Sequence, residues 1–335
     1  MKITRAKIEA EIAYGKRRQG LDNQIRIAYV AHSLLAKIVE GTPGDRVLGA
    51  LYGNLTKKTR PVVRVPNAES AVQQAARSGI AQSVASIHSD FEWACRDLLT
   101  DALEFWESRF TPALGKISPP PTSNSPIAKR GWSSTISDAL RSRSADEGFL
   151  LGCYSLLGLE ATDEDLACLP VFDFFRRCRN RIIHQDGTAG RDLVEFAKSQ
   201  EVRISFAGLA PTVRRMASSL PTFTATDPIP LTPQHAILFL VITANLFNRL
   251  ASRVRAPLTE DGYLRMTAHY AYGASQHPFR QSHYRNVVYP ASVFLRFRYG
   301  VTDVSKEQLI LRFKTLGLWD PMAARFKELF LVHGN

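Results

Sequence analysis

A cluster of cationic side chains occupies one short stretch of the sequence, residues 176–184. Its cationic members are Arg176, Arg177, Arg179, Arg181 and His184. A histidine titrates near neutral pH and can act as a general base or a general acid. An arginine keeps its charge and offers a planar fork to phosphate oxygens. RNA carries its own nucleophile, the 2′-hydroxyl, so a base, an acid and positive charge at the transition state could suffice to cleave it.

The pattern around this cluster predicts that it ends a helix. Val171 starts an apolar helical run, and Gly187 can adopt the left-handed conformation that closes a helix. His184 would lie in the last turn, where unsatisfied carbonyls favour a protonated imidazole. An acidic N-cap at 162–165 precedes this helix, and we expect Leu169-Pro170 to interrupt the chain between the two.

The spacing of Arg179 and His184 raises a geometric difficulty. Five positions on a regular helix rotate by about 140°, so the two side chains do not share one face. Either the helix end distorts, or each site is shared between two subunits. Asn180 could hydrogen-bond a phosphate or hold the loop after the helix.

Arg179-Asn180-x-x-x-His184 matches the pattern R-N-x-x-x-H. Over roughly residues 68–255 the chain resembles the HEPN superfamily, helical ribonucleases of toxin–antitoxin, CRISPR-associated and other antiviral systems. The resemblance implies that Arg179 and His184 are catalytic, with Asn180 in support and no metal or cofactor. It also implies a homodimer that pairs its motifs across a two-fold axis, and products with 2′,3′-cyclic phosphate and 5′-hydroxyl ends. An antitoxin or another regulatory protein is a possible partner in such a setting.

The remaining arginines of the stretch are candidates for holding substrate phosphates. These are Arg176, Arg177 and Arg181. The alternative is that they pair with acids in an ordinary cationic helix end, while His184 caps carbonyls. A carboxylate such as Asp90 could orient the catalytic arginine or histidine.

The composition favours an anionic partner, with nucleic acid first. The chain carries a net charge of +12 and a pI near 9.7. A basic but solvated surface is the alternative. Four cysteines without a C-x-x-C pair indicate neither a disulfide framework nor a zinc site. No signal peptide is evident, and the most apolar run, 236–244, is too short to span a bilayer and predicts a buried core helix. We therefore expect a cytoplasmic protein without a membrane partner.

The chain is expected to be mostly α-helical, with a HEPN-like helical bundle as its core and basic helical extensions. The expected regions are 1–66 (basic, helical), 67–255 (HEPN-like, with a loop insertion at 111–146) and 256–335 (basic, aromatic-rich, helical). Short extended pieces are expected at 61–66 and 202–206. Trp132, in the insertion, could stack a base, but pinning the loop to the body is the favoured interpretation.

Aromatic and cationic residues alternate in the last region, for example Phe294, Arg296, Phe297 and Arg298. That mixture suits contact with a nucleic-acid backbone and bases, and it suits equally a helical bundle with an aromatic core. Two rival functions therefore stand beside the ribonuclease. One is a non-catalytic basic helical regulator that binds nucleic acid on a HEPN-like scaffold. The other is a subunit that docks a protein partner.

Overall fold

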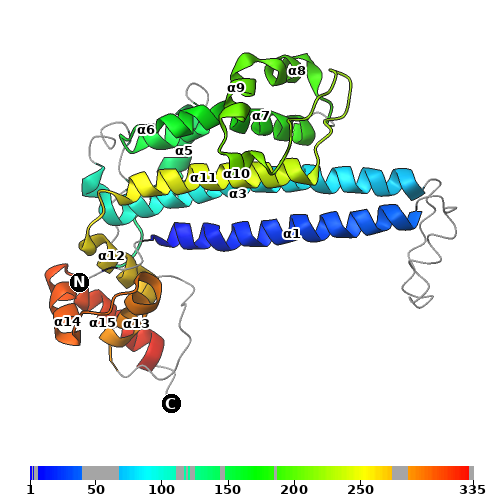
Figure 1. Ribbon diagram of the computed structural model, residues 1–335. Helices are drawn as coiled ribbons and strands as arrows, with labels where there is room; N and C mark the ends of the chain where they lie inside the picture. Colours follow the sequence, from blue (N-terminus) through cyan, green and yellow to red (C-terminus); the bar gives the residue numbers. More distant parts are fainter. Residues whose placement is uncertain are drawn as a thin grey trace, which may run out of the picture. The chain divides into compact units, whose positions relative to one another are not determined.

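The computed structural model describes residues 1, 3, 7–39, 68–110, 117, 120, 125–143, 148–184, 187–273 and 286–331. It is 77% helical and has no strand in these ranges, which confirms the mostly α-helical class. The helices, labelled as in Figure 1, are α1 (Glu9–Val39), α3 (Ala68–Trp106), α5 (Trp132–Arg143), α6 (Phe149–Leu156), α7 (Asp163–His184), α8 (Gly190–Lys198), α9 (Gln200–Gly208), α10 (Pro211–Arg214), α11 (Pro233–Arg255), α12 (Glu260–Ala268), α13 (Val288–Tyr299), α14 (Lys306–Thr315) and α15 (Trp319–Phe326). Three shorter turns are η1 (Glu107–Arg109), η2 (His269–Gly273) and η3 (Lys327–Leu331). The extended piece expected at 61–66 lies outside the described residues.

The chain divides into two compact units. Unit 1 comprises residues 1–13, 92–161 and 247–335, and unit 2 comprises 14–91 and 162–246. The chain passes from one unit to the other four times, within α1, α3 and α11 and in the segment between α6 and α7. This division by spatial contact runs across the three consecutive regions expected from the sequence, and those regions stay a prediction.

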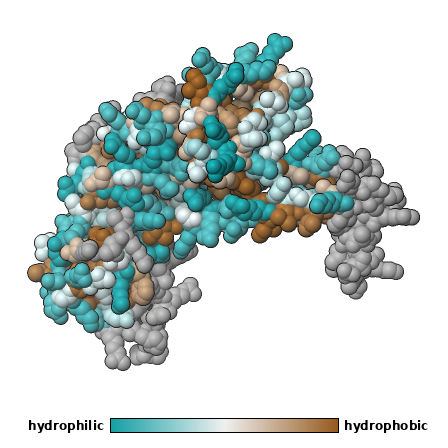
Figure 2. Space-filling view, viewed as in Figure 1, coloured by the Kyte–Doolittle hydropathy of each residue, from teal (hydrophilic) through white to brown (hydrophobic). Residues whose placement is uncertain are grey.

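Unit 2 is built on an aromatic core between α3, α7 and α11. Phe172 and Phe175 on α7 stack against Phe239 on α11, with ring centroids 5.9 and 4.9 Å apart. Phe91 on α3 meets Phe172 edge-on. In the same unit α1 runs beside α3 (Figure 1), and hydrophobic surface is visible along α1 in Figure 2, where Ile27, Val30 and Leu34 are exposed.

The helix that carries the cationic cluster is longer than expected. Thr162 and Asp165 cap its start reciprocally, because the Asp165 carboxylate accepts from the Thr162 N–H and the Thr162 hydroxyl accepts from the Asp165 N–H. α7 then continues through Pro170 to His184, so the interruption expected at Leu169-Pro170 is wrong. Packing of the apolar face of α7 offsets the one backbone hydrogen bond that a proline removes.

The short strand expected at 202–206 is also wrong, because these residues belong to α9. The Ser199 hydroxyl caps α9 by accepting from the Val202 N–H. Val202 and Ser205, three positions apart, are both buried, and the Ser205 hydroxyl donates to the Ala167 carbonyl on α7 at 2.5 Å. The apparent alternation in the sequence was therefore one turn of a helix with a 3.6-residue period.

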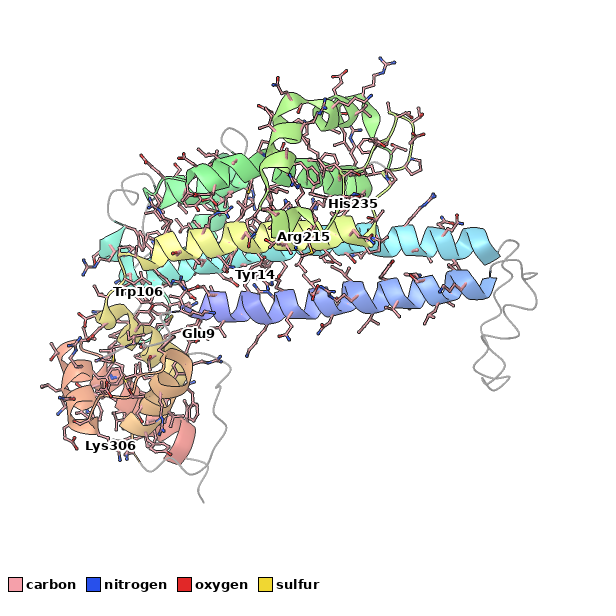
Figure 3. All side chains as sticks on the ribbon, viewed as in Figure 1. Glu9, Tyr14, Trp106, Arg215, His235 and Lys306 are labelled. Carbon is pink, nitrogen blue, oxygen red and sulfur yellow. The ribbon has the colours of Figure 1, made fainter. Side chains whose placement is uncertain are left out.

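Unit 1 has an aromatic core of its own. Trp106, labelled in Figure 3, meets Tyr263 edge-on at 5.1 Å, and Tyr263 in turn meets Tyr299 at 5.1 Å. Trp132 is fully buried at the start of α5, where the Glu104 carboxylate accepts from its backbone N–H. The burial of Trp132 agrees with the interpretation that it pins the insertion to the body.

One helix in the described part of the chain, α11, is long and apolar enough to cross a membrane by length and composition alone. Its most apolar window has a mean hydropathy of 1.4, and 61% of that window is buried inside the protein. Leu238, Phe239 and Leu246 are fully buried there. These features are those of a core helix, as the sequence predicted.

Candidate functional site

A shallow groove of about 350 Å³ lies along the end of α7 beside α8, within unit 2. It is lined by Arg176, Arg177, Asn180, Arg181, His184 and Asp192. The α7 members recur at intervals of three or four residues, which places them on one face of the helix. Five of the six residues expected to form the site are thus brought together, and Arg179 is not among them.

The chain after α7 closes one side of this groove. The helix ends at His184, and Gly187 adopts a φ of +76°, so the expected stop signal is confirmed. The Gly187 N–H donates to the Arg181 carbonyl at 3.2 Å. A segment before α11 then holds the turn, because the N–H groups of Ala189 and Gly190 donate to the Asp227 and Ala225 carbonyls. These backbone bonds fix where α8 begins.

Carboxylates accompany three arginines of the groove. Asp173 accepts from the Nε atoms of Arg176 at 2.6 Å and Arg177 at 2.8 Å. Arg181 pairs with Asp192 on α8. The Arg177 guanidinium also lies 3.9 Å from the centroid of the Phe196 ring, a cation–π contact that fixes its side chain. The groove therefore keeps a formal charge of about +1 before His184 is counted, because three arginines face two carboxylates.

Arg179 does not line the groove. Its Nη1 donates to the Asn180 side-chain oxygen at 3.1 Å, and its buried Nε has no hydrogen-bond partner. No carboxylate within the described ranges pairs with it. Arg179 is thus the guanidinium of the cluster whose charge no described carboxylate compensates.

A buried histidine that the sequence analysis did not single out lies on the Arg179 side of α7. His88 on α3 stacks on Phe172 at 5.9 Å and on Phe239 at 6.4 Å. Burial first, and then the positive charges of Arg179 and Arg176, lower the pKa of His88 to about 3. His88 is therefore neutral at physiological pH. Its position three residues before Phe91 marks it only as a core residue, so the sequence held no functional signal for it.

Asp90 does not orient Arg179 or His184, contrary to the hypothesis raised from the sequence. Its carboxylate pairs with Arg17 on α1. Burial raises the pKa of Asp90, although the neighbouring Arg17 charge and hydrogen bond act to lower it. Asp90 therefore serves the packing of α1 on α3 within unit 2.

The two ends of the R-N-x-x-x-H motif occupy different faces of a regular helix. α7 keeps its helical geometry through His184, so the expected distortion at the helix end is not found. Asn180 and His184, four positions apart, share the groove, while Arg179 lies near His88. Of the two solutions to the geometric difficulty, a site shared between subunits is the one still open.

The groove offers an exposed imidazole, a carboxamide and three guanidinium groups at one surface. An imidazole can move a proton to or from a ligand oxygen, and guanidinium groups can hold phosphate oxygens. Within the described ranges, no three His, Cys, Asp or Glu side chains cluster as metal ligands would. Comparison of the chain with protein-family models, with curated proteins and with solved structures gave no match.

Proposed function

We propose that this protein is a metal-independent endoribonuclease of HEPN type, with its cleavage site in the α7–α8 groove. The observation that carries the proposal is that Asn180 and His184 line one groove together with Arg176, Arg177 and Arg181. The R-N-x-x-x-H pattern on an all-helical unit supports the same assignment.

The proposed reaction needs only groups that RNA and this groove supply. The 2′-oxygen attacks the adjacent phosphorus as its proton leaves to a base, and the 5′-oxygen departs as it gains a proton from an acid. The products are a 2′,3′-cyclic phosphate and a 5′-hydroxyl. His184 serves as one of the two proton-transfer groups, and guanidinium groups stabilise the charge that develops on the phosphorane.

Arg179 enters this proposal through a second copy of the chain. In one copy it lies off the groove that contains His184, and its charge lacks a described carboxylate partner. A two-fold dimer that brings α7 helices together would place the Arg179 of one copy near the His184 of the other. The homodimer with a composite site is therefore part of the proposal.

The decisive experiment is cleavage of a mixed RNA pool in EDTA by wild type, His184→Ala and Arg179→Ala. We expect wild type to cut, and each variant to lose about 10²- to 10⁴-fold in rate, as removal of an acid–base group or an oxyanion donor does. A matched RNA with a single 2′-deoxy position should resist cleavage at that position. Mapping of the product ends should show cyclic phosphate and 5′-hydroxyl.

Two exposed neighbours serve as controls in the same unit. Ile183→Ala removes an exposed side chain next to His184, and Arg203→Ala removes an exposed arginine of α9 that lines none of the groove. Both should cut like wild type. If His184→Ala cuts like wild type, the site assignment is wrong. If wild type is inert towards every RNA, the enzyme proposal loses its support.

A second candidate function rests on the ion pairs of the groove. Three of the four arginines already contact carboxylates, as expected for a cationic helix end without catalysis. A non-catalytic regulator that binds nucleic acid would then use this surface for affinity alone. It predicts that RNA binding falls steeply with salt. It also predicts that His184→Ala binds RNA and functions as wild type does.

A further inference from the structure

A second groove, of about 570 Å³, lies between α13 and α14 in unit 1. Two aromatic side chains of α13 line it and remain open to solvent. Tyr289 is 44% exposed, and Phe297 is 66% exposed. Aromatic side chains usually bury most of their surface, so the exposure of two of them on one groove requires an explanation.

The neighbouring aromatic residues, in contrast, belong to the core of unit 1. Tyr263, Tyr272, Phe294 and Tyr299 are almost fully buried. Phe294 contacts Tyr299 at 5.7 Å and stacks on Tyr270 at 6.3 Å. The alternation of aromatic and cationic residues in this region therefore separates into two sets. One set forms the core of unit 1, and the pair Tyr289 and Phe297 faces the groove.

Positive charge accompanies the exposed pair. Arg296 and Lys306 line the same groove, and no carboxylate lines it within the described part of the chain. Lys306 lies at the first position of α14 (Figure 3). Arg296 makes no ion pair with any described residue, whereas Arg298, two positions later, lies 3.8 Å from the Glu9 carboxylate. The hydroxyl groups of Ser292 and Thr302 add hydrogen-bonding capacity.

We propose that the α13–α14 groove binds single-stranded RNA. Tyr289 and Phe297 stack on bases, while Arg296 and Lys306 contact the phosphate backbone. Proteins that bind single strands combine the same two contacts: aromatic side chains stack on any base, and cations contact the phosphate backbone. The two aromatic residues are eight positions apart, about 12 Å along α13, so they take bases that are not neighbours in the strand.

The charge favours RNA over a protein partner as the occupant. The segment from residue 249 to the end has 13 Lys and Arg against 6 Asp and Glu, a net charge of +7. The groove adds two cations and no described carboxylate to its aromatic surface. The inference goes beyond the proposed cleavage site, because it concerns the other unit and would stand if the α7–α8 groove were inert.

The test measures affinity of the full-length protein for a fluorescent single strand of about 12 nucleotides, a length within the range of single-strand sites. The strand carries 2′-O-methyl groups, so it cannot be cut by 2′-oxygen attack. Phe297→Ala and Tyr289→Ala should each weaken binding about tenfold, as loss of one stacking contact does. Phe297→Trp should retain affinity, because it keeps an aromatic face. Arg296→Ala should lower the slope of log affinity against log salt by about 0.7.

The matched controls come from the same unit. Leu311→Ala removes an apolar side chain of α14 that is 65% exposed, about as exposed as Phe297, but lies outside the groove. Lys327→Ala removes an exposed cation that does not line the groove. Leu311→Ala should leave the RNA affinity unchanged. Lys327→Ala should not act through stacking, so adding Phe297→Trp to Lys327→Ala should not change its RNA binding.

Three outcomes would overturn the proposal. The first is unchanged affinity in both alanine variants. The second is duplex RNA binding as tightly as the single strand, which would show phosphate contact without stacking. The third is a change in the oligomeric state of Phe297→Ala with unchanged RNA affinity, which would assign the groove to protein contact. Cleavage by wild type together with unchanged binding in both alanine variants would refute this proposal alone. Loss of binding in these variants from a wild type that does not cleave RNA would refute the cleavage site alone.

Discussion

The guanidinium group of Arg181 lies directly against the backbone of Gly190. A β-carbon at Gly190 would come within 2.6 Å of the guanidinium carbon, and the backbone there has a φ of +74°. Arg181 also pairs with Asp192 in the first turn of α8. The side chain that forms one wall of the α7–α8 groove is therefore held by a glycine and by a carboxylate.

Gly190→Ala should both strain the backbone and displace Arg181. Gly187 provides a matched control, because its φ is +76° but no atom of the other described residues lies within 4 Å of its missing β-carbon. We expect Gly187→Ala to cost about 1–2 kcal/mol of unfolding free energy through strain alone. Gly190→Ala should cost more and should also reduce RNA affinity. Urea unfolding and RNA titration of both variants measure the difference, and equal effects would show that the Arg181 contact contributes nothing.

The sequence predicted the apolar core helix and the two ends of the motif-bearing segment well, because these depend on local pattern. The apolar run at 236–244 indicated α11, and the Thr162–Asp165 cap and the stop at Gly187 are where the sequence indicated. The helix interruption predicted at Pro170 is wrong because the packing of α7 outweighs the local effect of a proline. Residues 202–206 misled because an alternating run of five residues fits one helical turn as well as a strand.

The site was only partly accessible to sequence reasoning. Spacing alone shows that Asn180 and His184 share a helical face and that Arg179 does not. What spacing cannot show is which acids come from elsewhere: Asp192 reaches Arg181 only after the chain has turned into α8. In the same way, the proximity of His88 to Arg179 depends on how α3 packs on α7. Such contacts are set by tertiary packing rather than by local pattern.

Asp173 should act as a competitor of the RNA backbone at the groove. Its carboxylate engages both Arg176 and Arg177, so Asp173→Asn frees two guanidinium groups and removes one negative charge. We expect RNA affinity at low salt to rise several-fold and the dependence on salt to become steeper. The cost in stability should be small, about 0–1 kcal/mol, since these pairs are partly exposed.

The control for this variant is Asp138→Asn. Asp138 pairs with Arg141 on α5 at 3.7 Å, and both side chains are largely exposed and remote in sequence from the groove. Salt titrations of RNA binding for wild type and the two variants separate a local effect from a change in total charge. Equal gains in the two variants would mean that net charge, and not the groove, governs affinity.

His88 should make the stability of the protein depend on pH in the acidic range. The pKa of His88 is lowered from 6.5 to about 3, through burial first and then the charges of Arg179 and Arg176, while Asp173 acts in the opposite direction. Between these two values the unfolded chain binds a proton that the folded chain does not. The contribution of His88 to the free energy of unfolding is therefore fully present above pH 6.5. It is lost as the pH falls towards 3, by up to about 1.4 kcal/mol per pH unit.

The variant His88→Phe tests this contribution. Phenylalanine keeps an aromatic ring against Phe172 and Phe239 but cannot bind a proton. We expect a shallower loss of stability between pH 6.5 and 4 in urea unfolding. A residual slope should remain, because burial also lowers the pKa values of His235 and His269. Identical slopes in wild type and His88→Phe would show that His88 is not the group responsible.

The shared-site arrangement predicts complementation between two inactive variants. If Arg179 of one copy acts with His184 of the other, a mixed dimer of Arg179→Ala and His184→Ala contains one intact site and one site that lacks both groups. Random exchange of equal amounts should then restore about a quarter of wild-type cleavage, because half of the dimers are mixed and each has one working site. The assay is RNA cleavage in EDTA before and after the two purified variants are mixed and allowed to exchange.

A mixture of Arg179→Ala with the Arg179→Ala, His184→Ala double variant is the control and should stay inactive, since none of its dimers contains an intact pair. Recovery in that control, or none in the test mixture despite proven exchange, would contradict a site shared in this way and would return both residues to separate roles within one chain.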